Sequence, residues 1–140
     1  MPAPADLDGL LARIPHRPPH LALDRVLTAD DCGVTVEKRV SGADVEGLWL
    51  LELSAQAAAV WNARATAGGS SHLGYLVAAR GWKFPRAATA GETLTITVEP
   101  TGALGPLARF HSTVRSGNEE LASGELTCAV VASPPARDHV

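Results

Sequence analysis

The chain has 140 residues, of which 46% are apolar and 19% charged, and its formal net charge is −3. This length and composition are typical of one folded domain with a real core and exclude a disordered chain. The mild negative charge provides no basic surface for nucleic acid or an anionic membrane, so we expect neither as a partner. The longest uncharged apolar stretch, residues 53–63, is too short to cross a bilayer.

The compartment and cofactor content follow from what the sequence lacks. Cys32 and Cys128 stand far apart without metal-site spacing, so we interpret both as reduced structural residues. The first residues lack the charged and apolar regions of a secretory signal, and we therefore expect a cytoplasmic protein. We find no motif for a metal or another cofactor and expect none.

The predicted elements run from a short helix through two strands and one long helix to four further strands. Residues 6–14 predict the short helix, because Asp6 can cap it and apolar residues then recur at helical spacing. Pro15 ends this helix, and residues 16–20, stiffened by two prolines, form an irregular connection. Alternating apolar and polar residues predict strands at 21–28 and 34–40, joined as a hairpin, and at 73–84, 93–99, 107–115 and 121–131.

The strand at 73–84 is apolar on both faces, so we expect it in the centre of the sheet. The other elements are organised around a long helix predicted from Gly47 to about Thr66, rich in Ala and Leu and followed by Gly68-Gly69. Because this helix is apolar on nearly every side, it should be buried. We therefore predict an α+β fold in which six antiparallel strands wrap around one helix, with an exposed sheet edge that favours a dimer.

Glu52 and Gln56 are the polar residues of this helix that call for an explanation. They are four residues apart and therefore lie on the same helix face. A carboxylate in an apolar helix is costly unless it is partnered. Glu52 therefore either accepts hydrogen bonds from backbone amides of the preceding loop or takes part in chemistry, and we favour chemistry.

Four segments carry a family resemblance. Residues 14–26 (IPHRPPHLALDRV) resemble a "PHR-x-P-x-L-L-x-D-R-V" opening, and residues 47–56 resemble a "PG-x-x-x-x-E-x-x-AQ" helix motif in which Glu46 replaces the proline. Residues 74–77 and 90–94 resemble a third strand and a "PGDTL" turn. In this order the segments resemble the hotdog-fold 3-hydroxyacyl-[acyl-carrier-protein] dehydratases. The segments LELSAQAAAVW, LGYLVAARG and ELASGEL are most similar to the divergent branch associated with aryl polyene biosynthesis.

The resemblance implies one hotdog domain over residues 1–140, with tails at 1–5 and 133–140. It implies elimination of water from a 3-hydroxyacyl thioester, carried on acyl carrier protein or coenzyme A, to give a trans-2-enoyl thioester. Glu52 then donates a proton to the leaving hydroxyl, and Gln56 orients Glu52. Gly47 marks the helix start, whose N–H groups polarise the thioester carbonyl. Trp49 and Tyr75, with Trp61, can line an acyl tunnel, although core packing is the ordinary role of such residues.

The sequence departs from this family at the catalytic base. The family's histidine precedes the helix, but no histidine lies between His20 and His72, and residues 41–45 contain none. We rank His20 first as a substitute that reaches a neighbouring subunit's site, and His72 second. His16, His111 and His139 are interpreted as non-catalytic, and a non-catalytic role is the more ordinary one for any single histidine here.

Two alternatives therefore stay open. Hotdog proteins include acyl thioesterases, in which a helix carboxylate activates water without the missing histidine. The chain can also be a degenerate subunit that binds acyl chains or pairs with an active paralogue. The expected partners are an acyl thioester and a second hotdog subunit, identical or related, and the fold alone does not decide between these activities.

Overall fold

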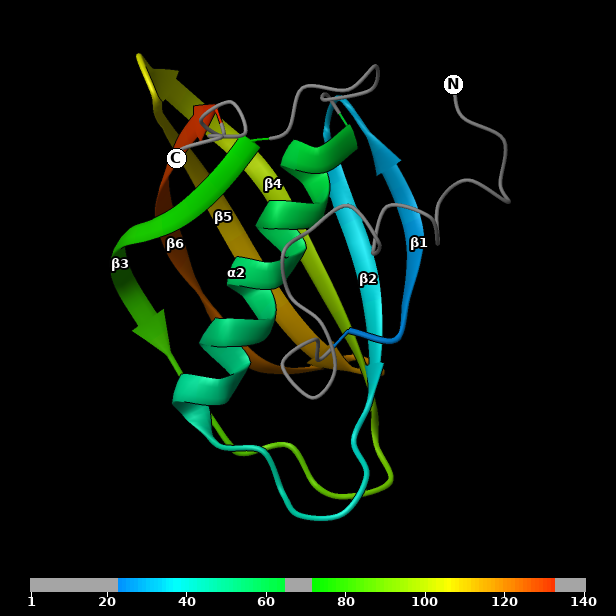
Figure 1. Cartoon of the computed structure of the whole chain (residues 1–140). Helices are drawn as coiled ribbons and strands as arrows, with labels where there is room; N and C mark the ends of the chain where they lie inside the picture. Colours follow the sequence, from blue (N-terminus) through cyan, green and yellow to red (C-terminus); the bar gives the residue numbers. More distant parts are fainter. Residues whose placement is uncertain (1–22, 65–71, 133–140) are drawn as a thin grey trace, which may run out of the picture.

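The computed structural model describes residues 23–64 and 72–132 of the chain (Figure 1). They form one long helix, α2 (Gly47–Arg64), and six strands: β1 (Arg25–Asp30), β2 (Gly33–Arg39), β3 (His72–Lys83), β4 (Thr93–Leu104), β5 (Leu107–Ser116) and β6 (Glu119–Ala132). The short helix predicted at residues 6–14, the connection at 16–20 and both tails lie outside the described residues.

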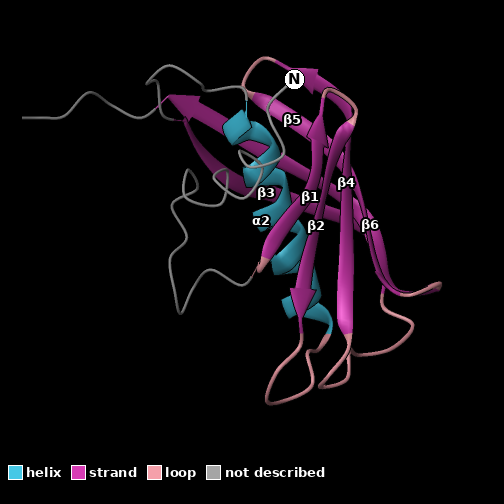
Figure 2. Ribbon diagram, turned by 90° about the vertical axis from the view of Figure 1, so that its right-hand side faces the viewer, coloured by secondary structure: helices cyan, strands magenta, loops and turns pink. Residues whose placement is uncertain are grey.

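The six strands form a single sheet in the order β1-β2-β4-β5-β6-β3, and every neighbouring pair is antiparallel. The sheet curves around α2, which lies against its concave face (Figure 1), and a view from the side shows the helix on that one face (Figure 2). This confirms the predicted architecture of an antiparallel sheet wrapped around a single helix. Among the described residues, no helix combines the length and hydropathy that a membrane crossing requires.

The core lies between α2 and the concave face of the sheet. In β4 the alternation is strict, with Leu94, Ile96 and Val98 fully buried, while the two threonines between them are half-buried. Burying side chains of this size stabilises the fold by roughly 1.5–3 kcal/mol each. The largest fully buried side chains come from α2, from four strands and from the residue after β2: Leu50, Leu53, Gln56, Val34, Val36, Leu94, Ile96, Phe110, Leu121, Leu126 and Val40.

The strand predicted in the centre of the sheet lies at its edge, so that prediction was wrong. Strand β3 pairs with β6 alone, and Leu76 and Val77 are 43% and 57% exposed. An apolar pattern on both faces indicates a strand that favours burial, but it does not show whether the strand is buried by its own chain or by another subunit. Here the two-sided pattern marks an exposed apolar edge.

The helix is also less completely buried than its composition predicted. Leu48 is 83% exposed and Trp49 is 44% exposed, because the sheet covers the side of α2 that carries Leu50, Leu53 and Ala57. The first turn of the helix is therefore open on its other side. The apolar residues exposed there line the site described below.

Strand β4 continues past the predicted end at Glu99 and reaches Leu104. Proline is usually excluded from the interior of a sheet because it lacks an N–H donor. Pro100 is tolerated here because the register between β4 and β5 shifts between Pro100 and Gly102, as at a β-bulge. A tight turn at residues 117–118 joins β5 to β6, and Gly117 has a φ of 61° there.

Candidate functional site

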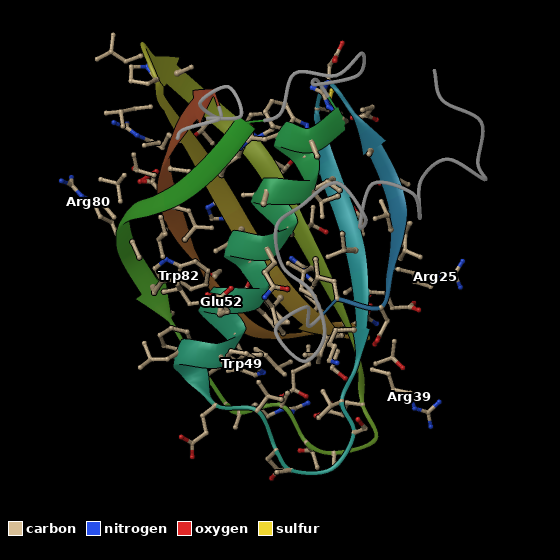
Figure 3. The ribbon with its side chains drawn as sticks, in the orientation of Figure 1. Arg25, Arg39, Trp49, Glu52, Arg80 and Trp82 are labelled. Carbon is tan, nitrogen blue, oxygen red and sulfur yellow. The ribbon has the colours of Figure 1, made fainter. Side chains whose placement is uncertain are left out.

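A pocket of about 740 Å³ lies at the start of α2. Gly47, Leu48, Trp49 and Glu52 line it from the helix, Glu46 lines it from the residue before the helix, and Phe84 lines it from the residue after β3. Figure 3 shows Trp49 and Glu52 on the lower half of α2, with Trp82 of β3 beside them. This volume is within the range of small-molecule sites, and the lining is apolar apart from two carboxylates.

The pair predicted from the four-residue spacing is present. The side-chain Nε2 of Gln56 donates a hydrogen bond to Oε2 of Glu52 at 3.1 Å. Gln56 is only 1% exposed, whereas Glu52 is half-buried and lines the pocket. The expectation that Glu52 itself is buried among apolar residues is therefore corrected, because its helix face opens on the pocket. A buried amide holds one oxygen of a carboxylate that a ligand can reach.

Gly47 marks the start of α2, as predicted. The N–H groups of Trp49 and Leu50 donate to the Glu46 carbonyl oxygen at 2.9 and 3.1 Å, which closes the first turn. A Cβ atom on Gly47 would lie 3.1 Å from the ring of Phe84. The helix N-terminus therefore reaches the pocket wall, and the positive end of the helix dipole favours a developing negative charge there.

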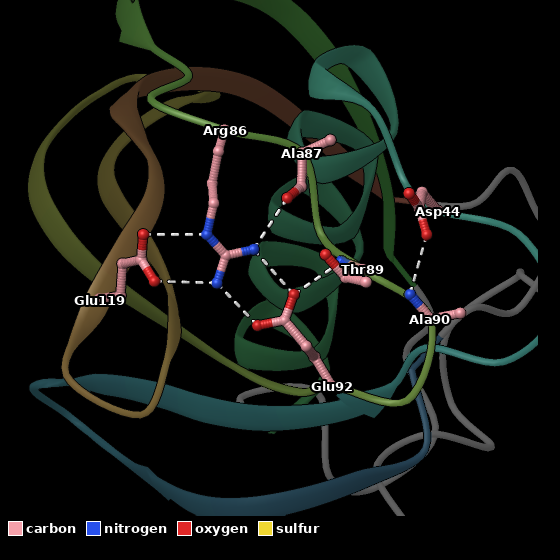
Figure 4. A network of polar contacts seen from close by, with 7 residues as sticks. All are labelled: Asp44, Arg86, Ala87, Thr89, Ala90, Glu92 and Glu119. Atoms are coloured by element: carbon pink, nitrogen blue, oxygen red, sulfur yellow. Dashed lines mark hydrogen bonds and ion pairs between the residues drawn. The ribbon is translucent and has the colours of Figure 1, made fainter.

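An ion-pair network holds the connector between β3 and β4, beside the loop that leads into this helix (Figure 4). Arg86 donates to both oxygens of Glu92 at 2.8 and 2.7 Å and to both oxygens of Glu119 at 2.9 and 3.0 Å. These hydrogen bonds raise the pKa of Arg86 and lower the pKa of both carboxyls below the usual range. Beside it, the N–H of Ala90 donates to Oδ1 of Asp44 at 2.9 Å. The connector between β3 and β4 is thereby tied to the loop before α2.

Trp61 packs in the fold and does not line the pocket. Its Nε1 donates to the carbonyl oxygen of Asp30 at 2.8 Å, and its ring meets Phe110 edge-on at 5.6 Å. The guanidinium of Arg64 lies 4.3 Å from the centre of the indole. Trp61 therefore links the last turns of α2 to the β1–β2 hairpin. It has the core-packing role and not the acyl-tunnel role that the sequence also allowed. The side chain of Tyr75 lies outside the described residues.

The histidine candidates are only partly described. His111 is exposed on the convex face of the sheet, in register with Glu99 and Glu125 and away from the helix, which agrees with a non-catalytic role. His16, His20 and His139 lie outside the described residues, as does the side chain of His72.

The backbone nevertheless places His72 relative to the pocket. His72 begins β3 and Phe84 follows its end. Figure 1 shows that β3 begins near the C-terminal end of α2 and ends near the start of α2. Within one chain the start of β3 is therefore remote from the pocket. An approach to Glu52 from a second subunit stays a prediction.

Sequence reasoning missed Phe84, which lines the pocket, and Trp82, which lies against it. Their rings stack with centroids 5.7 Å apart and an interplanar angle of 16°. The sequence offered one indirect signal, which is that the residues beneath the two rings, Gly47 and Gly124, are glycines. Nothing in the local pattern of either segment links these four positions.

The described thiols and carboxylates do not form a second centre. Burial raises the pKa of Cys128 to about 11, so this thiol is neutral at physiological pH. Within residues 23–64 and 72–132 there is no group of three or more His, Cys, Asp or Glu side chains that could hold a metal ion.

Comparison with solved structures defines the fold class of the protein. The structure resembles hotdog-fold proteins, among them the dehydratase heterocomplex ApeI:P from Xenorhabdus doucetiae, with a TM-score of 0.77 and 22% identity over 89% of this chain and 91% of that chain. It also resembles a hypothetical thioesterase with coenzyme A from Streptococcus pneumoniae, with a TM-score of 0.61 and 15% identity over 77% of this chain and 85% of that chain. These likenesses establish the fold.

The family follows from the sequence match. The family model described as ApeP-like, ApeP dehydratase, matches residues 10–137, and the chain belongs to this family of hotdog-fold dehydratases. The chain is also 29% identical to the 3-hydroxyacyl-[acyl-carrier-protein] dehydratase FabZ of Albidiferax ferrireducens, over 89% of this chain and 93% of that protein. The predicted resemblance to hotdog-fold dehydratases is therefore confirmed.

Proposed function

We propose that the protein removes water from a 3-hydroxyacyl thioester, carried on acyl carrier protein or coenzyme A, to give a trans-2-enoyl thioester. The observation that carries this proposal is the hydrogen-bonded pair of Glu52 and Gln56, which lines a pocket at the start of the central helix. Membership of a dehydratase family supports it. A proton donor beside a helix N-terminus suits a reaction in which a hydroxyl departs next to a polarised carbonyl.

In the proposed reaction a base removes the C2 proton, and the electron pair of the C2–H bond forms the C2–C3 double bond. The C3–O bond breaks as Glu52 donates its proton to the departing hydroxyl, which leaves as water. Gln56 keeps the carboxyl directed at the pocket through the 3.1 Å hydrogen bond. N–H groups at the start of the helix, at Gly47 and ahead of the Trp49 and Leu50 donors that close the first turn, polarise the thioester carbonyl and favour loss of the C2 proton.

We propose His20 as the base, acting at the site of a neighbouring subunit. The motif that contains it lies within the matched family region, residues 10–137. The titratable groups in the described lining of the pocket are Glu46 and Glu52, so a histidine base would come from another part of the chain or from a partner.

Thioester hydrolysis is the second candidate, and the acidic lining of the pocket favours it. If Glu52 acts as a carboxylate, it can take a proton from water while the oxygen attacks the thioester carbonyl, and the thiol then leaves. Substrate contacts from Trp49 and Tyr75 are part of either proposal. The non-enzymatic alternative is an acyl-binding subunit that supports an active paralogue.

We also propose that the exposed apolar edge of β3 pairs with a second hotdog subunit, identical or related. Leu76 and Val77 lie on that edge. The ApeI:P protein of Xenorhabdus doucetiae is a heterocomplex, which supports the version with a related subunit. Cys32 and Cys128 are both free, as suits the reducing cytoplasm in which we place the reaction.

The test is an assay of the purified full-length chain with matched 3-hydroxyacyl and plain acyl thioesters. Formation of the enoyl thioester, followed by its absorbance and by mass spectrometry, is the expected result. Release of free thiol from both substrates would instead support the thioesterase, and neither product would support the acyl-binding subunit.

A further inference from the structure

Two glycines of this chain are explained by their neighbours and not by their backbone conformation. Gly47 in α2 and Gly124 in β6 are absent from the glycines with positive φ, so a side chain would be compatible with the backbone at both. In each case an aromatic ring lies so close that it would have to shift to make room for a Cβ atom. A Cβ on Gly124 would lie 2.5 Å from the indole of Trp82, and one on Gly47 would lie 3.1 Å from the ring of Phe84.

The two rings belong to one structure that spans from the sheet to the helix. Trp82 and Phe84 are stacked at 5.7 Å, and the Nε1 of Trp82 donates to the carbonyl oxygen of Glu125 at 2.9 Å. The order across the molecule is therefore Gly124, Trp82, Phe84, Gly47. We call this set the aromatic column. Its sheet end is fixed by a hydrogen bond and by close contact with the β6 backbone, so the position of Phe84 depends on Trp82.

Phe84 is the part of this column that reaches the pocket. The other five lining residues belong to residues 46–52 at the start of α2, whereas Phe84 comes from the sheet side. It is exposed, although a phenylalanine at the end of a strand has no solubility reason to remain so. A rigid apolar wall beside a half-buried carboxylate is suited to contact the apolar part of a ligand whose polar centre is at that carboxylate.

We infer that Phe84 determines which acyl groups the pocket accepts, and that Trp82 is a positioning residue that holds it in place. This inference rests on the proposed function, in which Glu52 acts at C3 of the acyl chain. The carbons from C4 onward then share the pocket with the Phe84 ring. The column admits a slim, unbranched acyl group and disfavours a branch close to C4.

The test compares binding of two non-cleavable thioether analogues, one with a linear acyl chain and one branched at C4, to the purified full chain. Phe84→Ala should raise the ratio of branched to linear affinity by about tenfold or more, since one or two carbons of pocket space discriminate on that order. Phe84→Leu should change the ratio in the same direction but by less. This variant replaces Phe84→Ala in the test if the alanine variant folds poorly. Leu104→Ala, at the exposed hairpin between β4 and β5, is the matched control and should leave the ratio unchanged.

Gly124→Ala tests the column without altering the pocket lining, because its Cβ displaces the indole of Trp82. A purely structural role predicts a lower melting temperature and an unchanged ratio, whereas our inference predicts that the ratio moves with that of Phe84→Ala. An unchanged ratio in folded Phe84→Ala, or no binding of either analogue to the unaltered chain, would overturn the inference. Turnover is measured separately. A ratio that depends on Phe84 without enoyl product refutes only the dehydratase, and enoyl product with an unchanged ratio refutes only the role of Phe84.

Discussion

Two groups of residues lie near the start of α2: one forms the pocket, and the other holds the neighbouring segments together. Glu52 lines the pocket and Gln56 is buried behind it, while Arg86 ties the connector after β3 to the β5–β6 hairpin at Glu119. The pair could be predicted from its four-residue spacing, because helical periodicity fixes which side chains are neighbours. The Arg86 network could not be predicted from the sequence, because Glu119 belongs to a distant segment that comes near Arg86 only when the whole sheet has formed.

This network predicts how stability depends on pH. The folded protein lowers the pKa of Glu92 and Glu119 below the ordinary value of 4.5, so the ion pairs stabilise the fold fully above that value. The stabilisation is lost as the pH falls and the two carboxyls take up protons. We expect the melting temperature to fall more steeply below about pH 5 in the unaltered chain than in Arg86→Met. Parallel curves for the two proteins would contradict this account.

At the scale of elements, the sequence predicted the long helix and all six strands, because strict alternation and a proline-free Ala/Leu segment are local signals. It misplaced β3, whose two-sided apolar pattern does not show which chain covers it. It also missed the aromatic column, because Trp82 and Gly124 are distant in sequence and meet only when β3 pairs with β6. The sequence also overestimated the burial of Glu52, because the apolar composition of α2 does not show that the sheet covers only one side of the helix.

A buried hydroxyl pair joins α2 to β5 and gives an element-level prediction. Ser112 donates to the Oγ of Ser54 at 2.7 Å, and Ser54 donates to the Leu50 carbonyl oxygen at 3.3 Å. Ser54→Ala leaves the buried Ser112 donor without its acceptor and should cost about 1–3 kcal/mol of unfolding free energy. Ser112→Ala should cost less, and the double variant should cost less than the sum of the two. Urea unfolding of the three variants checks this, and strict additivity would argue against a coupled pair.

The whole molecule has an exposed apolar edge that we propose is covered by a second subunit. Val77→Lys places a charge on the β3 edge, where it opposes pairing between sheets without disturbing the core. We expect the unaltered chain to sediment as a dimer at micromolar concentration, and Val77→Lys to sediment as a monomer with a similar melting temperature. Leu104→Lys, also exposed but on the β4–β5 hairpin, is the control and should remain dimeric. A monomeric unaltered chain would contradict self-pairing.

The central claim is that Glu52 supplies the proton for the departing hydroxyl, and replacing it with glutamine tests this most directly. Glu52→Gln is nearly isosteric and should keep the fold, but it has no acidic proton to give. Gln56→Ala removes only an orienting hydrogen bond and should slow the reaction less. The measurement is the rate of enoyl thioester formation beside a melting curve for each variant. We predict loss of turnover in folded Glu52→Gln and a partial loss in Gln56→Ala, whereas full activity in Glu52→Gln would show that this carboxyl is structural.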